Sequence, residues 1–304
     1  MKKKYYSNGK LLITAEYLVL DGATALALPT KFGQSLEVLE TNSSQIVWKS
    51  FDADQSIWFE TTIIFDEIKN NNLKKDNAVR TKLIEILIAA NNMNPKVFLN
   101  NQGFDIQTSL TFPRKWGLGT SSTLINNIAQ WFEIDAFELL NKSFGGSGYD
   151  IACAQHDFPI LYTLQNKKTT ISVCDFRPVI SDKIYFVYLN QKQNSSLGIK
   201  MYREKDFDLP QNITNINDIT NKLIDSNISF DLFCELLQKH ENVLSDILQL
   251  SPIKSQQFAD FKGTIKSLGA WGGDFAMVMA VENPASYFQS KGFDVILTYD
   301  DMIL

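Results

Sequence analysis

Residues 117–122 read Gly-Leu-Gly-Thr-Ser-Ser, and this stretch decides the fold that we expect. It follows the alternating segment 104–112, which predicts a half-buried strand, and it opens a predicted helix over 121–132. Glycine lets backbone N–H groups approach a ligand, hydroxyl residues stand where helix N-caps stand, and a helix N-terminus carries partial positive charge. The loop therefore predicts a phosphate site, although a tight turn with a hydroxyl cap is the commoner use of such a sequence.

Two further glycine-bearing loops and one lysine carry possible chemistry. Residues 145–150 read Gly-Gly-Ser-Gly-Tyr-Asp and place Asp150 at the start of a predicted helical turn, where a carboxylate is ordinarily a dipole-stabilising residue. Residues 267–274 read Ser-Leu-Gly-Ala-Trp-Gly-Gly-Asp and lead into a predicted strand, where a turn is the ordinary reading. Lys10 lies among the first predicted strands, where a lysine is usually a solvated edge residue. Taken singly, each of these features leaves a functional role open.

Strand and helix patterns intermix along the rest of the chain. The Asn8-Gly9 pair predicts a turn between short strands, and Pro29 is expected to end the strand 24–28. Helical spacing predicts helices over 79–90 and 230–250, and the polar segment 211–221 predicts a surface connection. Because regular βαβ alternation is missing, the pattern favours an α+β fold over a doubly wound sheet.

Length sets the expected domain organisation. A chain of 304 residues is long enough for one large domain or two moderate ones. Strands resume near residue 165 after a helical middle section, so we expect an N-terminal domain over 1–165 and a C-terminal domain over 166–304.

Composition excludes several classes of function. The chain has 29 Lys and Arg against 34 Asp and Glu, a net charge of −5, which gives no basic field for nucleic acid. Its 3 Cys and 2 His lack zinc-ligand spacing, and sparse cysteine fits a reducing compartment. The sequence shows neither a signal peptide nor the ~20-residue apolar run of a membrane helix. We therefore expect a cytoplasmic protein that acts on a small molecule and contacts neither nucleic acid nor membrane.

Four segments, taken in their order, resemble the motifs of the GHMP kinase superfamily, which includes galactokinase, homoserine kinase, mevalonate kinase and phosphomevalonate kinase. Residues 7–17 resemble the first motif, 117–122 the second and 268–274 the third. Residues 146–152, Gly-Ser-Gly-Tyr-Asp-Ile-Ala, resemble the aspartate segment of the mevalonate and phosphomevalonate branch, and part of this string also names a bacterial subgroup of the superfamily. The four segments span residues 7 to 274, nearly the whole chain.

This resemblance implies a fold and an activity. The implied fold is a two-domain α+β GHMP kinase fold, with a ribosomal protein S5 domain 2-like N-terminal half, a ferredoxin-like C-terminal half and ATP in the cleft between them. The implied activity is an ATP- and Mg2+-dependent kinase that phosphorylates a hydroxyl or a phosphate, with mevalonate and phosphomevalonate as candidate acceptors. The Glu-Tyr pair at 16–17 and the Gly-Gly-Asp run at 272–274 resemble the phosphomevalonate version. A homodimer is compatible with the resemblance.

The resemblance also implies residue roles. Asp150 would accept or orient the acceptor proton, and Lys10 would pair with it. Ser122 and Glu138 would hold magnesium, although Glu138 is about one residue out of register and a solvated helix-face glutamate is the usual alternative. The implied nucleotide-binding residues are Gly117, Leu118, Gly119, Thr120, Ser121 and Ser122. The implied substrate-binding residues are Glu16, Gly272, Gly273 and Asp274. Phosphoryl transfer relies on positioning and charge neutralisation, so the shortage of His and Cys is no obstacle to this chemistry.

Two departures from the family pattern keep other functions open. Trp271 stands where a small residue is usual, so we expect it either to shrink the acceptor pocket or to close its loop, and the stretch between Ser122 and Asp150 is shorter than is typical. A non-catalytic GHMP-fold protein that binds a ligand or regulates a pathway is therefore the second hypothesis. A decarboxylating kinase of the diphosphomevalonate type ranks lower, because that branch lacks the Gly-Tyr-Asp arrangement. A hydrolase ranks last, because His156 and His240 accompany no nucleophile motif such as GxSxG.

Overall fold

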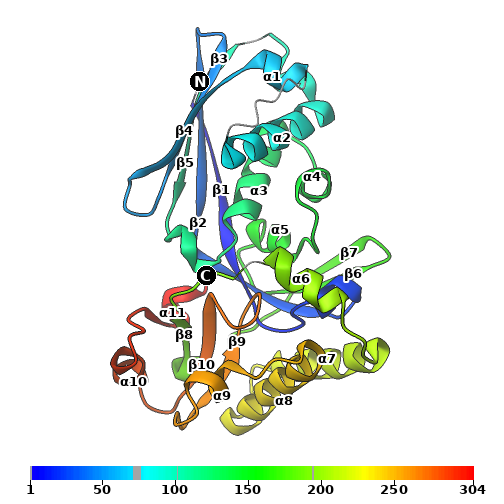
Figure 1. The fold of residues 1–304 in the computed structure, drawn as a ribbon, viewed down its shortest axis with the longest axis vertical. Helices are drawn as coiled ribbons and strands as arrows, with labels where there is room; N and C mark the ends of the chain where they lie inside the picture. Colours follow the sequence, from blue (N-terminus) through cyan, green and yellow to red (C-terminus); the bar gives the residue numbers. More distant parts are fainter. Residues whose placement is uncertain (1, 71–76, 101, 194) are drawn as a thin grey trace. The chain divides into compact units, whose positions relative to one another are not determined.

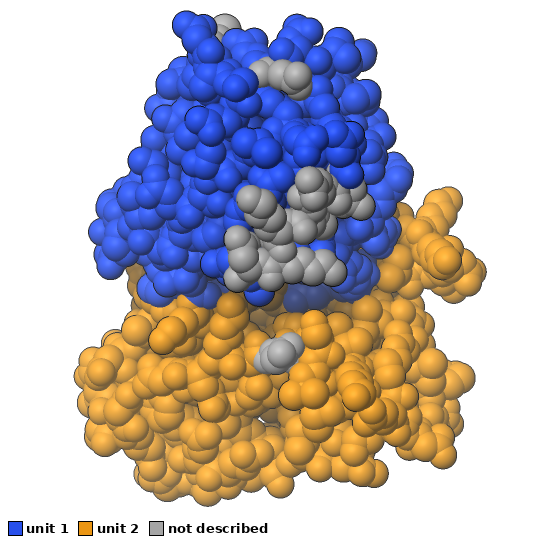
Figure 2. Space-filling view, turned by 45° about the horizontal axis from the view of Figure 1, so that its top comes forward, with its two compact units in different colours: residues 1–9, 32–114, 118–155 blue, residues 10–31, 115–117, 156–304 orange. Residues whose placement is uncertain are grey.

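The computed structural model describes residues 2–70, 77–100, 102–193 and 195–304. The chain forms two compact units, unit 1 from residues 1–9, 32–114 and 118–155 and unit 2 from residues 10–31, 115–117 and 156–304 (Figure 2). These units alternate along the sequence because the long strands β1 (Lys2–Leu12) and β2 (Ala25–Thr41) contribute residues to both. The single domain boundary that we expect near residue 165 stays a prediction.

Unit 1 is built on a mixed sheet. Strand β2 pairs with β5, β5 with β3 and β3 with β4; the β3–β5 pair is parallel and the other two are antiparallel. The remaining strands of this unit are β3 (Gln45–Phe51), β4 (Ile57–Ile64) and β5 (Gly103–Leu110). Its helical segments are α1 (Phe65–Lys69), α2 (Ala78–Met93), η2 (Pro95–Phe98), α3 (Thr120–Phe132), α4 (Ala136–Ser143) and α5 (Tyr149–Ala154), with η3 (Arg114–Trp116) at the junction to unit 2.

Helices cover one face of this sheet (Figure 1). Alternate strand residues such as Val38, Trp48 and Ile106 turn inward and pack with the apolar stripes of α2, α3 and α4 in one buried cluster. The helical periodicity of residues 79–90 and 121–132 is therefore confirmed in α2 and α3, because the spacing that predicted the helices is the spacing of their buried faces.

Unit 2 contains a second, fully antiparallel sheet with the order β11-β8-β10-β9. The first residues of β2 pair with β6, and β6 pairs with β7. The strands after β5 are β6 (Ile160–Gln165), β7 (Lys168–Val173), β8 (Ile184–Tyr188), β9 (Thr264–Ser267), β10 (Phe275–Met279) and β11 (Ile296–Thr298). The helical segments are η1 (Leu18–Asp21), η4 (Ser181–Lys183), α6 (Ser195–Arg203), α7 (Leu209–Leu223), α8 (Phe230–Leu248), α9 (Ile253–Gln257), α10 (Ala285–Ser290) and α11 (Tyr299–Met302).

Strand alternation in β9 sends neighbouring residues to opposite faces of this sheet. Ile265 lies opposite Val278 and joins the apolar cluster with residues of α9 and α10. Lys266 lies opposite Met277 and, on the other face, approaches residues of α8. The register therefore places a lysine in the interior, between the sheet and the longest helix of the described residues.

Three local predictions are wrong, each for a physical reason. The Asn8-Gly9 pair makes no turn, because β1 continues through it and pairs with β2. Pro29 does not end a strand, because β2 runs through it while its carbonyl accepts the backbone N–H of Leu304 at 3.3 Å. The polar segment 211–221 forms most of helix α7, which Asp208 caps and whose buried side chains recur at helical spacing, namely Ile216, Ile219, Thr220 and Leu223.

Among the described residues, no helix combines the length and the apolar character that crossing a membrane requires.

Candidate active site

The loop before α3 has an open helix N-terminus. Gly117 and Gly119 both adopt positive φ, 69° and 93°, which glycine adopts without strain. Gly119 is the N-cap of α3 and supplies no side-chain hydrogen bond, whereas Asn77 and Asp135 cap α2 and α4. The hydroxyl residues thus lie within the first turn rather than at the N-cap. The amides of that turn are left available for an anionic group, as the phosphate prediction requires.

The three hydroxyls of this turn differ in exposure. Ser121 is exposed and Thr120 is half-buried. Ser122 is only 2% exposed, and its hydroxyl donates to the carbonyl of Gly119 at 2.9 Å. Leu118 is fully buried and anchors the loop. Ser121 is therefore the hydroxyl best exposed for phosphate, and the roles of Ser121 as a nucleotide contact and Ser122 as a magnesium ligand stay predictions.

A buried polar network holds α3 in place beneath this loop. Thr123 donates its hydroxyl to the side chain of Gln34 at 2.8 Å, and Asn127 donates to the Gln34 carbonyl at 2.9 Å. Ser7, from the first motif, donates to Asn127 at 2.7 Å and accepts from Asn126 at 2.8 Å. Buried and fully bonded polar groups fix one arrangement of the elements that carry them. These residues were not predicted from the sequence, although two adjacent asparagines inside an apolar helical stripe were the available signal.

Asp150 lies in the first turn of α5, half-buried, where its Oδ1 accepts the backbone N–H of Ile151 at 3.1 Å. Asn126 of α3 fastens this helix: it donates to the carbonyl of Ala154 at 3.4 Å and accepts from Gln155 at 2.9 Å. Helices α3 and α5 therefore pack together, so unit 1 carries the loop residues Leu118–Ser122 and the aspartate on neighbouring elements.

Glu138 lies on the solvent-exposed face of α4 and is paired with a lysine. Its side chain is 56% exposed and forms an ion pair with Lys142, one turn later on α4, at 3.1 Å. This geometry is typical of a solvated helix face. Among the described residues, no group of three or more His, Cys, Asp or Glu side chains is placed to hold a metal ion. A magnesium role for Glu138 stays a prediction and would require this ion pair to open.

In unit 2, the first, second and third motifs meet at Gly117. The ammonium of Lys10 donates to the Gly117 carbonyl at 3.0 Å. The Asp274 carboxylate lies against the same residue, because a Cβ added to Gly117 would lie 2.3 Å from Asp274 Cγ. Burial raises the pKa of Asp274, and the charge of Lys10 opposes that rise. Lys10, Gly117 and Asp274 thus form one charged contact within unit 2, while the pairing of Lys10 with Asp150 stays a prediction.

The third motif forms a tightly held loop over residues 268–274. Gly269 and Gly272 have positive φ, and so do Trp271 and Asp274, at 48° and 53°. Gly273 lies so close to Gln193 that an added Cβ would be 2.3 Å from the Gln193 Cγ. Roles for Gly272, Gly273 and Asp274 in substrate binding stay predictions.

Trp271 is buried in unit 2. Its side chain is part of the interior, at 5% exposure, and its indole N–H donates to Glu241 Oε1 of α8 at 3.0 Å. The bulk of the indole is therefore accommodated by the interior of unit 2, and the two expected roles of Trp271, shrinking an acceptor pocket or closing its loop, stay predictions.

Glu16 is buried rather than exposed to a substrate. It is 1% exposed, forms an ion pair with Lys266 of β9, and lies 3.3 Å from His240 Nε2 of α8. Burial raises the pKa of Glu16 to about 7, against the opposing charge of Lys266. A role in substrate binding stays a prediction. Sequence patterns do not predict Lys266, His240 and Glu241 as its partners, because more than 200 residues separate them from Glu16 and no local pattern marks them.

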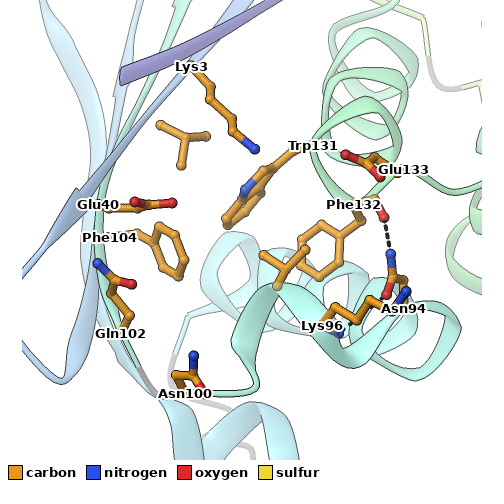
Figure 3. Close-up of a pocket in the computed structure, with 12 residues that line it drawn as sticks. Lys3, Glu40, Asn94, Lys96, Asn100, Gln102, Phe104, Trp131, Phe132 and Glu133 are labelled. Carbon is orange, nitrogen blue, oxygen red and sulfur yellow. Dashed lines mark hydrogen bonds between the residues drawn. The ribbon is translucent and has the colours of Figure 1, made fainter. Parts of the chain in front are cut away.

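A separate pocket of about 270 Å³ lies in unit 1 at the other end of α3 (Figure 3). Lys3, Glu40 and Trp131 line it, and Glu133, just past the end of α3, adds a negative charge. Helix α3 has 13 residues and is therefore about 20 Å long. The C-terminal end of a helix carries partial negative charge, which disfavours phosphate. This pocket is therefore distinct from the candidate active site.

Comparison with known proteins identifies the fold. No protein-family model and no curated protein matches the sequence. The structure of Streptococcus pneumoniae phosphomevalonate kinase with phosphomevalonate and AMPPNP matches 95% of this chain and 95% of that chain, at 16% identity and a TM-score of 0.70. Methanococcus jannaschii mevalonate kinase matches 98% of this chain and 97% of its own at 15% identity and a TM-score of 0.69. Lactococcus lactis galactokinase complexed with galactose matches 98% and 92% at 12% identity and a TM-score of 0.71. Over nearly its whole length the chain therefore has the two-domain α+β fold of the GHMP kinases, as its four ordered motifs predict.

Proposed function

We propose that the chain is an ATP-dependent phosphotransferase that moves a γ-phosphate to a hydroxyl or phosphate group of a small molecule. The observation that supports it most is the uncapped N-terminus of α3, approached by a loop with two positive-φ glycines, in a chain with the GHMP kinase fold. Backbone amides and a helix dipole provide what a nucleotide phosphate needs, namely fixed donors and positive potential.

The acceptor chemistry is assigned to Asp150. A half-buried carboxylate in the first turn of α5, close to the α3 that carries the phosphate loop, is suited to accept or orient the proton of an attacking hydroxyl. Lys10 would stabilise negative charge that develops on the transferred group. In this proposal Gly117, Leu118, Gly119, Thr120, Ser121 and Ser122 contact the nucleotide.

The proposed reaction requires magnesium to bind only a few oxygens of the protein. This ion keeps several waters and takes one or two side chains together with substrate phosphates, so a cluster of three acidic residues is not required. Ser122 would provide one oxygen once its buried hydroxyl turns away from the Gly119 carbonyl. Glu138 is the carboxylate implied by the family resemblance, and it would have to leave its ion pair with Lys142. When bound, the ion would neutralise charge on the β- and γ-phosphates.

Mevalonate and phosphomevalonate are the first acceptors to test, because the Glu-Tyr and Gly-Gly-Asp residues at 16–17 and 272–274 resemble the phosphomevalonate version of the motifs. The matched S. pneumoniae structure is described with phosphomevalonate and AMPPNP, and the matched galactokinase with galactose. A panel should therefore contain mevalonate, phosphomevalonate, galactose and a sugar phosphate.

The deciding experiment measures ADP release from Mg-ATP with each acceptor, for the wild-type chain and for Asp150→Asn. Acceptor-dependent ADP release that Asp150→Asn abolishes supports the proposal. Release that is equal in both proteins removes Asp150 from the reaction. If ATP raises the melting temperature but no acceptor is phosphorylated, the non-catalytic hypothesis is favoured instead.

A further inference from the structure

Unit 2 contains a buried charge cluster formed by Glu16, His240, Glu241 and Lys266. All four side chains are at most 1% exposed. Lys266 is central: its ammonium pairs with Glu16, lies 4.0 Å from Glu241 and donates to its neighbour's carbonyl, that of Ser267, at 2.8 Å. Enclosing ionisable groups in this way is costly unless they are paired, and here the ammonium of Lys266 faces the carboxylates of both Glu16 and Glu241.

Two adjacent residues of α8 bind two different motifs. His240 accepts the backbone N–H of Ala15 through Nε2 at 3.0 Å, in the turn that follows β1. Ala15 and Tyr17 in this turn hold positive φ of 66° and 64° without being glycine, which strains the backbone and requires support from surrounding contacts. Glu241 accepts the indole N–H of Trp271, which also has positive φ, in the glycine-rich loop.

The turn 13–17 and the loop 268–274, which the cluster contacts, each contain or closely follow a residue of the candidate active site. The turn 13–17 follows β1, and Lys10 lies three residues before its start. The loop 268–274 ends at Asp274, whose carboxylate lies against Gly117. The buried charge cluster therefore contacts both of the segments that lead to Lys10 and Asp274, the partners of Gly117.

We propose that Glu241 and Lys266 are positioning residues that hold the turn 13–17 and the loop 268–274 in one arrangement, and so place Lys10 and Asp274 against Gly117. Glu241 holds the loop through the Trp271 hydrogen bond, and Lys266 joins the loop to the turn by binding Glu16 beside Glu241. The consequence for nucleotide binding rests on the proposed function, whereas the consequence for loop order does not.

Backbone hydrogen exchange tests the effect on loop order without any activity. Trp271→Phe keeps an aromatic ring and removes the donor to Glu241. The matched control is Trp58→Phe, because Nε1 of Trp58 is buried and finds no hydrogen-bond partner in the described part of the chain. We expect amides in 269–273 to exchange at least tenfold faster in Trp271→Phe, with β10 unchanged, and Trp58→Phe to match the wild type in this loop.

Lys266→Met removes the ion pair with Glu16 that connects the loop 268–274 to the turn 13–17. We expect faster exchange in 13–17 and in 269–273 together, whereas Trp271→Phe accelerates the second segment alone. The control is Glu235→Gln on the exposed face of α8, where Glu235 pairs with Lys239. If Lys266→Met does not fold, the Trp271→Phe result decides. Wild-type exchange in 269–273 of Trp271→Phe would overturn the proposal.

Binding of Mg-AMPPNP tests whether the positioning of Lys10 and Asp274 by the buried charge cluster matters for the proposed function. We expect Trp271→Phe to raise the Kd of AMPPNP about tenfold while Trp58→Phe leaves it unchanged. Failure of the wild-type chain to bind AMPPNP would contradict the proposed function and leave the exchange result to judge the positioning role. Faster loop exchange with an unchanged Kd would contradict the placement of Lys10 and Asp274 by the buried charge cluster.

Discussion

Lys10 donates its ammonium to the carbonyl oxygen of Gly117 at 3.0 Å, which joins the first motif to the first glycine of the second. Asp274, the last residue of the third motif, lies against the same glycine. Residues that are 107 positions apart and more thus meet at one backbone unit. The close approach of Asp274 explains why glycine stands at position 117. The contact also shows that the three motifs, far apart in sequence, meet in the folded chain.

Lys10→Met removes the cation of this contact. We expect kcat to fall by about 10²–10³-fold, the size of effect seen when one charge-stabilising donor is lost. The measurement is steady-state ADP release with the acceptor that the panel identifies. Lys4→Met is the control, because Lys4 lies on the same strand, is 63% exposed and pairs with Glu37. A Lys10→Met enzyme as fast as Lys4→Met would contradict the role of Lys10.

Gly117→Ala tests the close approach of Asp274. At φ of 69° alanine costs about 1–2 kcal/mol, and its Cβ would also collide with the Asp274 carboxylate. Gly145→Ala is the matched control, since Gly145 has φ of 70° but no atom within 4 Å of an added Cβ. We expect urea unfolding to show an extra loss of about 1–3 kcal/mol for Gly117→Ala. Equal losses in the two variants would show that Asp274 does not pack against Gly117.

We expect Asp150→Asn to preserve the fold and to lose the phosphotransferase activity. Its carboxylate accepts a hydrogen bond from the amide of the next residue, Ile151, and an asparagine oxygen accepts the same bond. We expect a loss of about 10²–10⁴-fold in kcat with little change in the KM for ATP, as for removal of a general base. Asp218→Asn, the same change at an exposed position of α7, serves as the control. A large rise in KM without a fall in kcat would assign Asp150 to binding instead.

The pH dependence of stability tests the burial of Glu16, which Lys266, His240 and Glu241 face. A carboxyl whose folded pKa rises from 4.5 to about 7 binds its proton more tightly in the folded state. Its stabilisation is complete below pH 4.5 and is lost as the pH rises through 7, a difference of about 3 kcal/mol at 1.36 kcal/mol per pH unit.

Glu16→Gln isolates this effect. The buried imidazole of His240, whose pKa is lowered well below 6.5, acts in the opposite sense as the pH falls, and it is present in both proteins. We expect the free energy of unfolding of the wild type, relative to Glu16→Gln, to decrease between pH 4.5 and 8 in urea titrations. A difference that does not vary with pH would contradict the raised pKa of Glu16 in the folded protein.

The sequence predicted those parts of the fold that local patterns determine. The stripe of α3 and its glycine loop were visible because a helix repeats its buried face and a positive φ favours glycine. Helix α7 was missed because its polar residues outnumber a narrow buried stripe, and the turn at Asn8-Gly9 was wrongly predicted because pairing of β1 overrides local turn preference.

The buried charge cluster could not be predicted from sequence. No sequence pattern distinguishes Lys266 from other lysines of the chain, and His240 and Glu241 look like ordinary residues of an amphipathic helix. Only the register of β9 against β10 and the packing of α8 on β9 bring them to Glu16. The ordered motifs located the glycine loops and the aspartate segment, but not the residues that hold these loops in place.

The most direct test of the central claim is phosphorus NMR of the purified chain with Mg-ATP and the acceptor panel. We predict that one acceptor acquires a new phosphate signal in equal amount to the ADP formed, and that Asp150→Asn produces neither. Formation of free inorganic phosphate without a phosphorylated acceptor, or no consumption of ATP with any member of the panel, would contradict the assignment as a phosphotransferase.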